Sequence, residues 1–234
     1  MRVLKIRDGL WRWVAPHPGW EPEFDAPGGW GQMVGSVYAE YDEAVVLIDP
    51  MLPPDVKDRD VFWAALDRDV TRLARPVLVL VGCVDHGRSA DAVAARYRAA
   101  GRDVTVVGDA LIRDLASCDL DETFDEFPLP EGLRTWPIAG LSPGERAFVL
   151  DPWRAAVFAD AVLGTGGNHV RVAPATWGVK TPAGSARYES TFRPAIRRVA
   201  KTRPEILLPS HGDPVLAGGA AALDDALVLP PWGQ

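Results

Sequence analysis

The stretch Val77-Leu78-Val79-Leu80-Val81-Gly82-Cys83-Val84-Asp85-His86-Gly87-Arg88-Ser89 dominates the fold prediction. It begins with a run of valine and leucine, which is typical of a strand buried on both faces. The run ends at an acid and a histidine, two residue types that bind metal ions. Ser89 stands where it can cap a helix over residues 90–100. The stretch therefore predicts a buried strand that carries Asp85 and His86 to its carboxyl end.

The residues around this strand predict a regular order of elements. Strands are expected before it at residues 4–6, 10–14, 32–41 and 44–48. Apolar residues at helical spacing then predict a helix over 60–73, and a further strand is expected over 104–107. A strand, a helix and a second strand at this spacing indicate a right-handed parallel crossover.

The second half of the chain repeats this kind of order. Strands are predicted at residues 133–139, 146–150, 155–158 and 206–208, and helices at 109–116, 187–200 and 217–227. Each half thus has strands first and then helix with parallel strand. This order predicts an α/β fold of two mixed β-sheets packed together with helices on the outer faces, an αββα sandwich. The length of 234 residues allows one large domain, and we expect a single domain over 1–234.

Two long segments are rich in glycine and contain tryptophan. Residues 15–31 also hold several prolines and include Trp20 and Trp30, while residues 164–184 are predicted to be irregular. Loops of this length in a compact domain often cover a binding site. The alternative is that the tryptophans only pack the loops onto the body of the protein.

The composition argues against several classes of function. The formal charge of −7 and a pI near 5.1 repel phosphate backbones, so we expect no nucleic-acid partner. The sequence contains no apolar run of the roughly 20 residues that a membrane helix needs, and its first residues lack a signal-peptide pattern. We therefore expect a soluble, cytoplasmic protein that contacts no membrane. Cys83 and Cys118 are predicted to be free thiols.

Acids and histidines follow three predicted apolar strands. Asp85 and His86 follow the first, Asp160 follows 155–159, and His211 follows 206–210. Open α/β sheets bind ligands at the carboxyl ends of their strands. A single residue of this kind is usually structural, but four of them at equivalent places favour a shared site.

These residues, together with three motifs, resemble the metallo-β-lactamase fold superfamily over nearly the whole chain. The motifs are Val46-Leu47-Ile48-Asp49-Pro50, Ser142-Pro143-Gly144-Glu145 and Leu208-Pro209-Ser210-His211-Gly212. Asp85-His86 resembles the end of the H-x-H-x-D-H motif, and Phe158-Ala159-Asp160 resembles the strand that carries the bridging aspartate. The resemblance implies the two-sheet sandwich that the order of elements also predicts.

The same resemblance implies that part of the family's metal centre is missing. Its first metal site would use the positions of Val81, Cys83 and Leu141, where valine and leucine cannot bind a metal. The positions of the second site are retained as metal-binding residues, and they are Asp85, His86, Asp160 and His211. The resemblance therefore implies at most one divalent metal, with zinc the first choice and manganese or iron the others.

One metal ion with an open position lowers the pKa of a bound water to about 7 and can support hydrolysis. The substrate would be a small ester, thioester, lactone, amide or phosphoester. We expect Asp85 to be either a ligand or the catalytic general base. Without the charge of a second metal, catalysis would be weaker or would use another electrophile such as Lys180, Arg88 or His169.

A site without any metal is the alternative. Asp85 could accept hydrogen bonds from backbone amides of the helix near Ser89, and the two histidines could pair with each other or with Asp160. Cys83 could be a soft ligand or a packed thiol. The chain would then be a catalytically lapsed member that binds a small molecule or a protein partner in the old crevice. The sequence leaves enzymatic activity and oligomeric state open.

Overall fold

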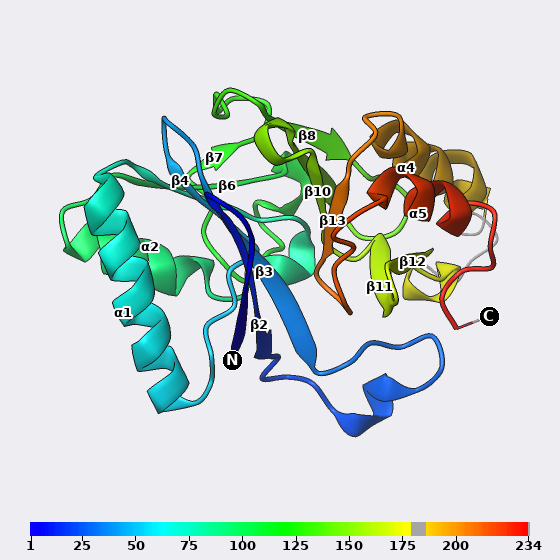
Figure 1. The fold of residues 1–234 in the computed structure, drawn as a ribbon, viewed down its shortest axis with the longest axis horizontal. Helices are drawn as coiled ribbons and strands as arrows, with labels where there is room; N and C mark the ends of the chain where they lie inside the picture. Colours follow the sequence, from blue (N-terminus) through cyan, green and yellow to red (C-terminus); the bar gives the residue numbers. More distant parts are fainter. Residues whose placement is uncertain (179–185, 234) are drawn as a thin grey trace.

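The computed structural model describes residues 1–178 and 186–233 and has four layers. In Figure 1, α1 and α2 lie on one side of the molecule and α4 and α5 on the other, with the sheets between them. The two main sheets are mixed, as the sequence predicted. The predicted α/β sandwich with outer helices is confirmed.

The larger sheet has seven strands in the order of the sequence. They are β1 (Arg2–Arg7), β2 (Leu10–Pro16), β3 (Met33–Glu40), β4 (Val45–Ile48), β5 (Val77–Leu80), β6 (Val104–Gly108) and β7 (Glu122–Thr123). The strands β1 to β4 are antiparallel, whereas β4 to β7 run parallel. The change occurs at β4 because the connection from β4 to β5 passes through a helix, which returns the chain to the same end of the sheet.

The smaller sheet has the order β13-β10-β9-β8. Its strands are β8 (Leu133–Pro137), β9 (Arg146–Leu150), β10 (Ala155–Phe158) and β13 (Ile206–Pro209). Only the pair β10 and β13 is parallel, so both strands end at the same edge. A separate hairpin is formed by β11 (Val162–Gly166) and β12 (His169–Val172).

The helices cover the outer faces of these sheets. They are α1 (Val56–Leu73), α2 (Ala90–Ala99), α4 (Arg193–Ala200) and α5 (Gly219–Ala226). Asp55 caps α1, and its carboxylate accepts a hydrogen bond from the amide of Asp58. None of the helices in the described ranges 1–178 and 186–233 is long and apolar enough to cross a membrane.

The central strand β5 shows why its sequence is apolar at every position. Val77 and Val79 pack in the core that α1 and α2 cover, and Leu78 and Leu80 pack in the core between the two sheets. Alternate side chains of a strand point to opposite faces, so a strand buried on both faces needs no polar position.

Local structure differs from the predictions in several places. Residues 109–116 form only a 3₁₀ turn over Ala110–Ile112, because Leu111 and Leu115 are exposed and a longer helix would have no apolar face to bury. The segment 164–184 was predicted to be irregular, but it includes most of the β11–β12 hairpin; its residues 179–185, with Lys180, lie outside the described residues. Ser89 stands at the start of α2, yet its hydroxyl accepts a hydrogen bond from the amide of Leu52 instead of capping the helix.

The core between the sheets gives a first prediction. Phe148 is fully buried there, and Phe148→Ala should lower the free energy of unfolding by about 3 to 5 kcal/mol because it removes buried apolar surface and leaves a cavity. Urea denaturation measures this change. Leu111→Ala is the control, since Leu111 is 71% exposed and should change stability by less than about 0.5 kcal/mol. Equal effects of the two changes would contradict the assignment of the core.

Candidate functional site

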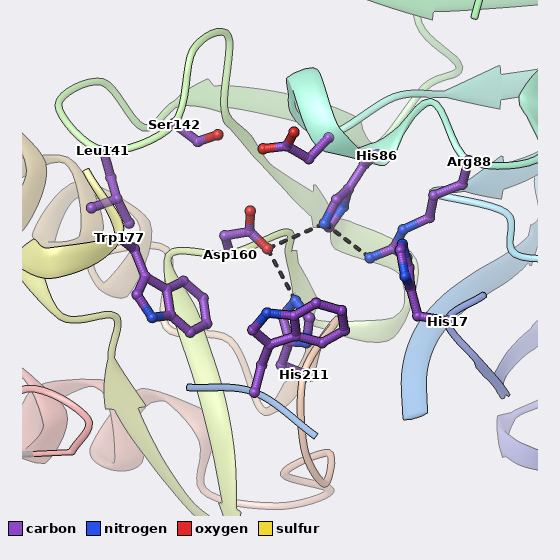
Figure 2. A pocket seen from close by; sticks show the side chains of 10 residues that line it. His17, His86, Arg88, Leu141, Ser142, Asp160, Trp177 and His211 are labelled. Carbon is purple, nitrogen blue, oxygen red and sulfur yellow. Dashed lines mark hydrogen bonds and ion pairs between the residues drawn. The ribbon is translucent and has the colours of Figure 1, made fainter. Parts of the chain in front are cut away.

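The polar residues of the site come from the carboxyl ends of four strands. Asp49 follows β4, Cys83 and His86 follow β5, Asp160 follows β10, and His211 follows β13. These ends surround a cavity of about 410 Å³. Its lining residues are His17, Trp30, Asp85, His86, Arg88, Leu141, Ser142, Asp160, Trp177 and His211, most of which are labelled in Figure 2.

Asp49 orients His86 through a hydrogen bond to its ring. Its Oδ2 lies 2.7 Å from His86 Nδ1, and its Oδ1 accepts a hydrogen bond of 2.6 Å from the amide of Gly82. Both side chains are buried. A ring nitrogen that faces a carboxylate carries the proton, so Nδ1 is the donor. The other ring nitrogen, Nε2, therefore faces the cavity.

Asp160 is the point on which the other side chains converge. Its Oδ1 lies 3.2 Å from His86 Nε2 and 3.2 Å from His211 Nε2, as the dashed lines in Figure 2 show. Its Oδ2 accepts a hydrogen bond of 3.6 Å from the thiol of Cys83. The structure thus brings together three of the residues expected to share a site, and adds Cys83.

The electrostatics of this cluster favour an ionised Asp160. Burial alone would raise the pKa of its carboxyl, but His86 and His211 hold that pKa well below its usual value. Burial is the largest influence on two neighbours of Asp160, because it disfavours the charged form of each. It raises the pKa of the Cys83 thiol to about 12, and it lowers the pKa of His211 despite the contact with Asp160.

Glu145 holds the end of β10 in place. Its buried Oε1 accepts hydrogen bonds from the amides of Asp160, at 2.9 Å, and Ala161, at 2.6 Å. Burial and the neighbouring charge of Asp160 raise the pKa of Glu145 to about 8. The glutamate of the Ser142-Pro143-Gly144-Glu145 motif therefore positions the carboxylate of Asp160 through the backbone.

Arg12 positions His211 in a similar way. Its Nη2 donates to the carbonyl oxygens of Pro209, at 3.0 Å, and Gly212, at 2.8 Å, on the two sides of His211. The guanidinium is buried and packs on Gly35, where a Cβ atom would lie only 2.5 Å from Nη2. Gly35 thus leaves the space that Arg12 needs to reach the last strand.

The tryptophan-containing loops line one side of the cavity. Trp177 donates from Nε1 to Gly28 O at 2.6 Å, and Trp232 donates to Gly29 O at 2.7 Å. These bonds tie the segment between β2 and β3, drawn in blue in Figure 1, to Trp177 and to Trp232 near the C-terminus. Trp30 lies edge-on to His211, with ring centroids 5.1 Å apart. Trp30 therefore packs on the body of the protein and also lines the cavity.

The remaining predicted residues lie in different places. Asp85 lines the cavity but is exposed at its rim, and its role as ligand or general base stays a prediction. His169 is exposed on β12. His17 is half-buried, packs against Trp30 and also lines the cavity, where no sequence pattern placed it. Arg88 does reach the site, where its Nη2 lies 2.9 Å from His86 Nε2.

The side chains fit a metal ion by their chemistry. Cys83, His86 and Asp160 each offer a ligating atom, and these atoms all lie within 4.8 Å of one another. Sulfur, nitrogen and oxygen in this combination suit zinc. His86 also donates its other ring N–H to a carboxylate, as metal-bound histidines usually do. His211 contacts Asp160, and its buried Nδ1 has no partner among the described residues.

Comparison with solved structures identifies the architecture. A metallo-beta-lactamase from Pontibacter korlensis matches with a TM-score of 0.60 and 16% identity, covering 96% of this chain and 99% of that one. The chain has the metallo-β-lactamase fold. A beta-lactamase domain protein from Burkholderia ambifaria gives a TM-score of 0.63 at 16% identity, covering 96% of this chain and 74% of that one. The metallo-beta-lactamase FIM-1 from Pseudomonas aeruginosa, in its mono-zinc form, matches with a TM-score of 0.57 and 12% identity, covering 97% of this chain and 96% of that one.

Searches by sequence found no relative: no family model and no curated protein matches the chain. The likeness is therefore one of fold. Three positions bear on the expected loss of the first metal site. Val81 is fully buried in the core beneath α1 and α2, Leu141 lines the cavity, and Cys83 faces Asp160.

The indole hydrogen bonds of the loop give a second prediction. Trp177→Phe should raise the rate at which a protease cleaves within residues 22–32 by about fivefold, because it removes a bond worth about 1 kcal/mol that holds the loop. Limited proteolysis followed by mass spectrometry measures the cleavage. Trp63→Phe, on α1 away from this loop, should leave the rate unchanged. Equal rates for Trp177→Phe and the unaltered chain would refute the role of this bond.

Proposed function

We propose that the chain is a hydrolase-like protein of the metallo-β-lactamase fold that holds at most one divalent metal ion, with zinc the first choice and manganese or iron the others. Its substrate would be a small ester, thioester, lactone, amide or phosphoester. The observation that carries the proposal is the convergence of Cys83, His86 and Asp160 beside His211 at the floor of the cavity.

The ligand set follows from the contacts. Cys83, His86 and Asp160 would hold the metal. His211 would be a further ligand, because its Nε2 already lies beside Oδ1 of Asp160. Asp49 supports this set because it fixes the tautomer of His86. Val81 and Leu141, at the positions of the first metal site, have no ligating atoms, which supports a limit of one ion.

A bound metal would supply a polarising charge and a water of lowered pKa. The residues of the chain would do the rest. Partial burial and the charge of Asp160 raise the pKa of Asp85 at the rim, which suits a group that takes up a proton. Trp30 and Trp177 would exclude water and offer apolar surface to the substrate. A cavity of about 410 Å³ limits the substrate to a small or medium molecule.

Metal analysis tests the proposal. The chain purified without chelator should carry close to one zinc, manganese or iron ion per molecule, and Asp160→Ala should lose it. Elemental analysis by mass spectrometry measures both. Asp151→Ala, which removes a surface carboxylate paired with Arg134, is the matched control and should keep the metal. Absence of stoichiometric metal, together with no hydrolysis of any ester or phosphodiester in a substrate panel, would contradict the proposal.

Metal affinity separates the two possible roles of Asp85, ligand or general base. As a reference, Asp49→Asn should weaken metal binding by about 10- to 100-fold, as expected for a residue that orients a ligand. Asp85→Asn should weaken binding to a similar or greater extent if Asp85 is a ligand. If Asp85 is a general base, binding should persist while hydrolysis falls by about 10²- to 10⁴-fold. Titration with a competing chelator gives the affinities.

One observation favours a second candidate, a metal-free protein that binds a small molecule or a protein partner in the crevice. Arg88 already contacts the cavity-facing nitrogen of His86, so a positive group of the chain stands near the metal position. A small-molecule ligand should then raise the melting temperature in the presence of EDTA, and should still do so in His86→Ala. Thermal denaturation across a metabolite library tests this, and stabilisation that disappears with EDTA would exclude it.

A further inference from the structure

Arg88 enters the site from a strained backbone. Its φ of 39° lies in the left-handed region, which is strained for a residue with a side chain and which glycine adopts freely. The residue stands just after the 3₁₀ turn Val84–His86 that ends in the site. A strained residue at such a point persists where the contacts of its side chain hold it.

Those contacts hold the guanidinium between β3, β4 and the last strand. Nη1 donates to the carbonyl oxygens of Gly35, at 3.2 Å, and Asp49, at 3.4 Å. Nη2 donates to Ser210 Oγ at 2.7 Å. It also lies 2.9 Å from His86 Nε2, a contact that Figure 2 marks with a dashed line. Ser210 is buried next to His211. The guanidinium thus contacts the segment that carries His86 and the segment that carries His211.

The contact with His86 is the one that matters for a metal. Because Nδ1 faces Asp49, Nε2 is the ring nitrogen of His86 that can offer a lone pair, in the ring plane, toward the cavity. That nitrogen can contact Arg88 or bind a metal ion, but it cannot do both. The positively charged guanidinium also repels a cation at this position.

We propose that Arg88 competes with the metal ion for His86 Nε2 and so sets the metal affinity of the site. Metal binding then requires Arg88 to leave His86, which breaks a charge-assisted hydrogen bond and moves the guanidinium toward Ser210 or the cavity. The inference rests on the proposed metal site of Cys83, His86 and Asp160. It accounts for the position of the Arg88 guanidinium directly beside a group of side chains that could bind a metal ion.

The test compares metal affinities without measuring catalysis. The full chain is stripped with a chelator and titrated with Zn²⁺ and with Co²⁺, whose absorption reports the thiolate of Cys83. Arg88→Ala should bind each metal about 10- to 100-fold more tightly than the unaltered chain, since a hydrogen bond to a charged group no longer has to be broken. Arg88→Gly should do the same and also removes the backbone strain, so it serves if Arg88→Ala folds poorly.

Two controls accompany these variants. Arg75→Ala removes an arginine that bonds to Tyr41 O at 2.6 Å near the opposite ends of the strands, and it should leave the affinity unchanged. Asp160→Ala in the Arg88→Ala background should abolish the tight binding, which assigns the metal to this site. Circular dichroism confirms that each variant is folded.

The outcomes separate the two proposals. Tighter binding in both Arg88 variants, lost with Asp160, supports the competition. Equal affinity in the unaltered chain and in the folded Arg88 variants overturns the competition and leaves the metal site standing. Absence of binding in the unaltered chain and in both variants overturns the metal site and the competition together.

Discussion

The hydrogen bond between Asp49 and His86 is the interaction on which the site depends. It lies at the end of β4, joins two buried side chains over 2.7 Å, and determines which nitrogen of His86 faces the cavity. A second bond from the same carboxylate to Gly82 fixes the end of β5. If His86 turned over, its contacts with Asp160 and Arg88 would both be lost. The pair therefore couples the geometry of the parallel strands to the chemistry of the cavity.

Burial makes the charge of Asp160 energetically costly. A buried carboxylate needs compensation, and Asp160 receives it from two histidines, a thiol and the backbone support of Glu145. Cys83 and His86 follow β5, His211 follows β13, and Glu145 directly precedes β9. Strand ends serve this purpose because their backbone groups leave the sheet and their side chains can turn toward a common point.

The apolar cores of the fold lie apart from the polar cluster of the site. The three larger cores lie beneath α1 and α2, between the sheets, and beneath α4 and α5, and a small fourth core contains Ala15, Val34 and Met51 beside Trp30. This separation explains how solved structures at only 10 to 16% identity share the fold over nearly the whole chain. It also explains why fold alone says little about which ion, if any, the cluster holds.

The sequence by itself determined the sandwich and the meeting of His86, Asp160 and His211, because apolar periodicity and strand ends are local properties that a parallel topology then brings together. The tertiary structure alone decided three other matters. Asp85 and Cys83 lie two residues apart, yet the turn after β5 sends Asp85 to the rim and Cys83 toward Asp160. Arg88 reaches His86 only through a left-handed backbone that local preferences disfavour. The aromatic cover over His211 depends on indole hydrogen bonds between segments some 150 to 200 residues apart, such as Trp177 to Gly28 and Trp232 to Gly29, and no local pattern encodes such contacts.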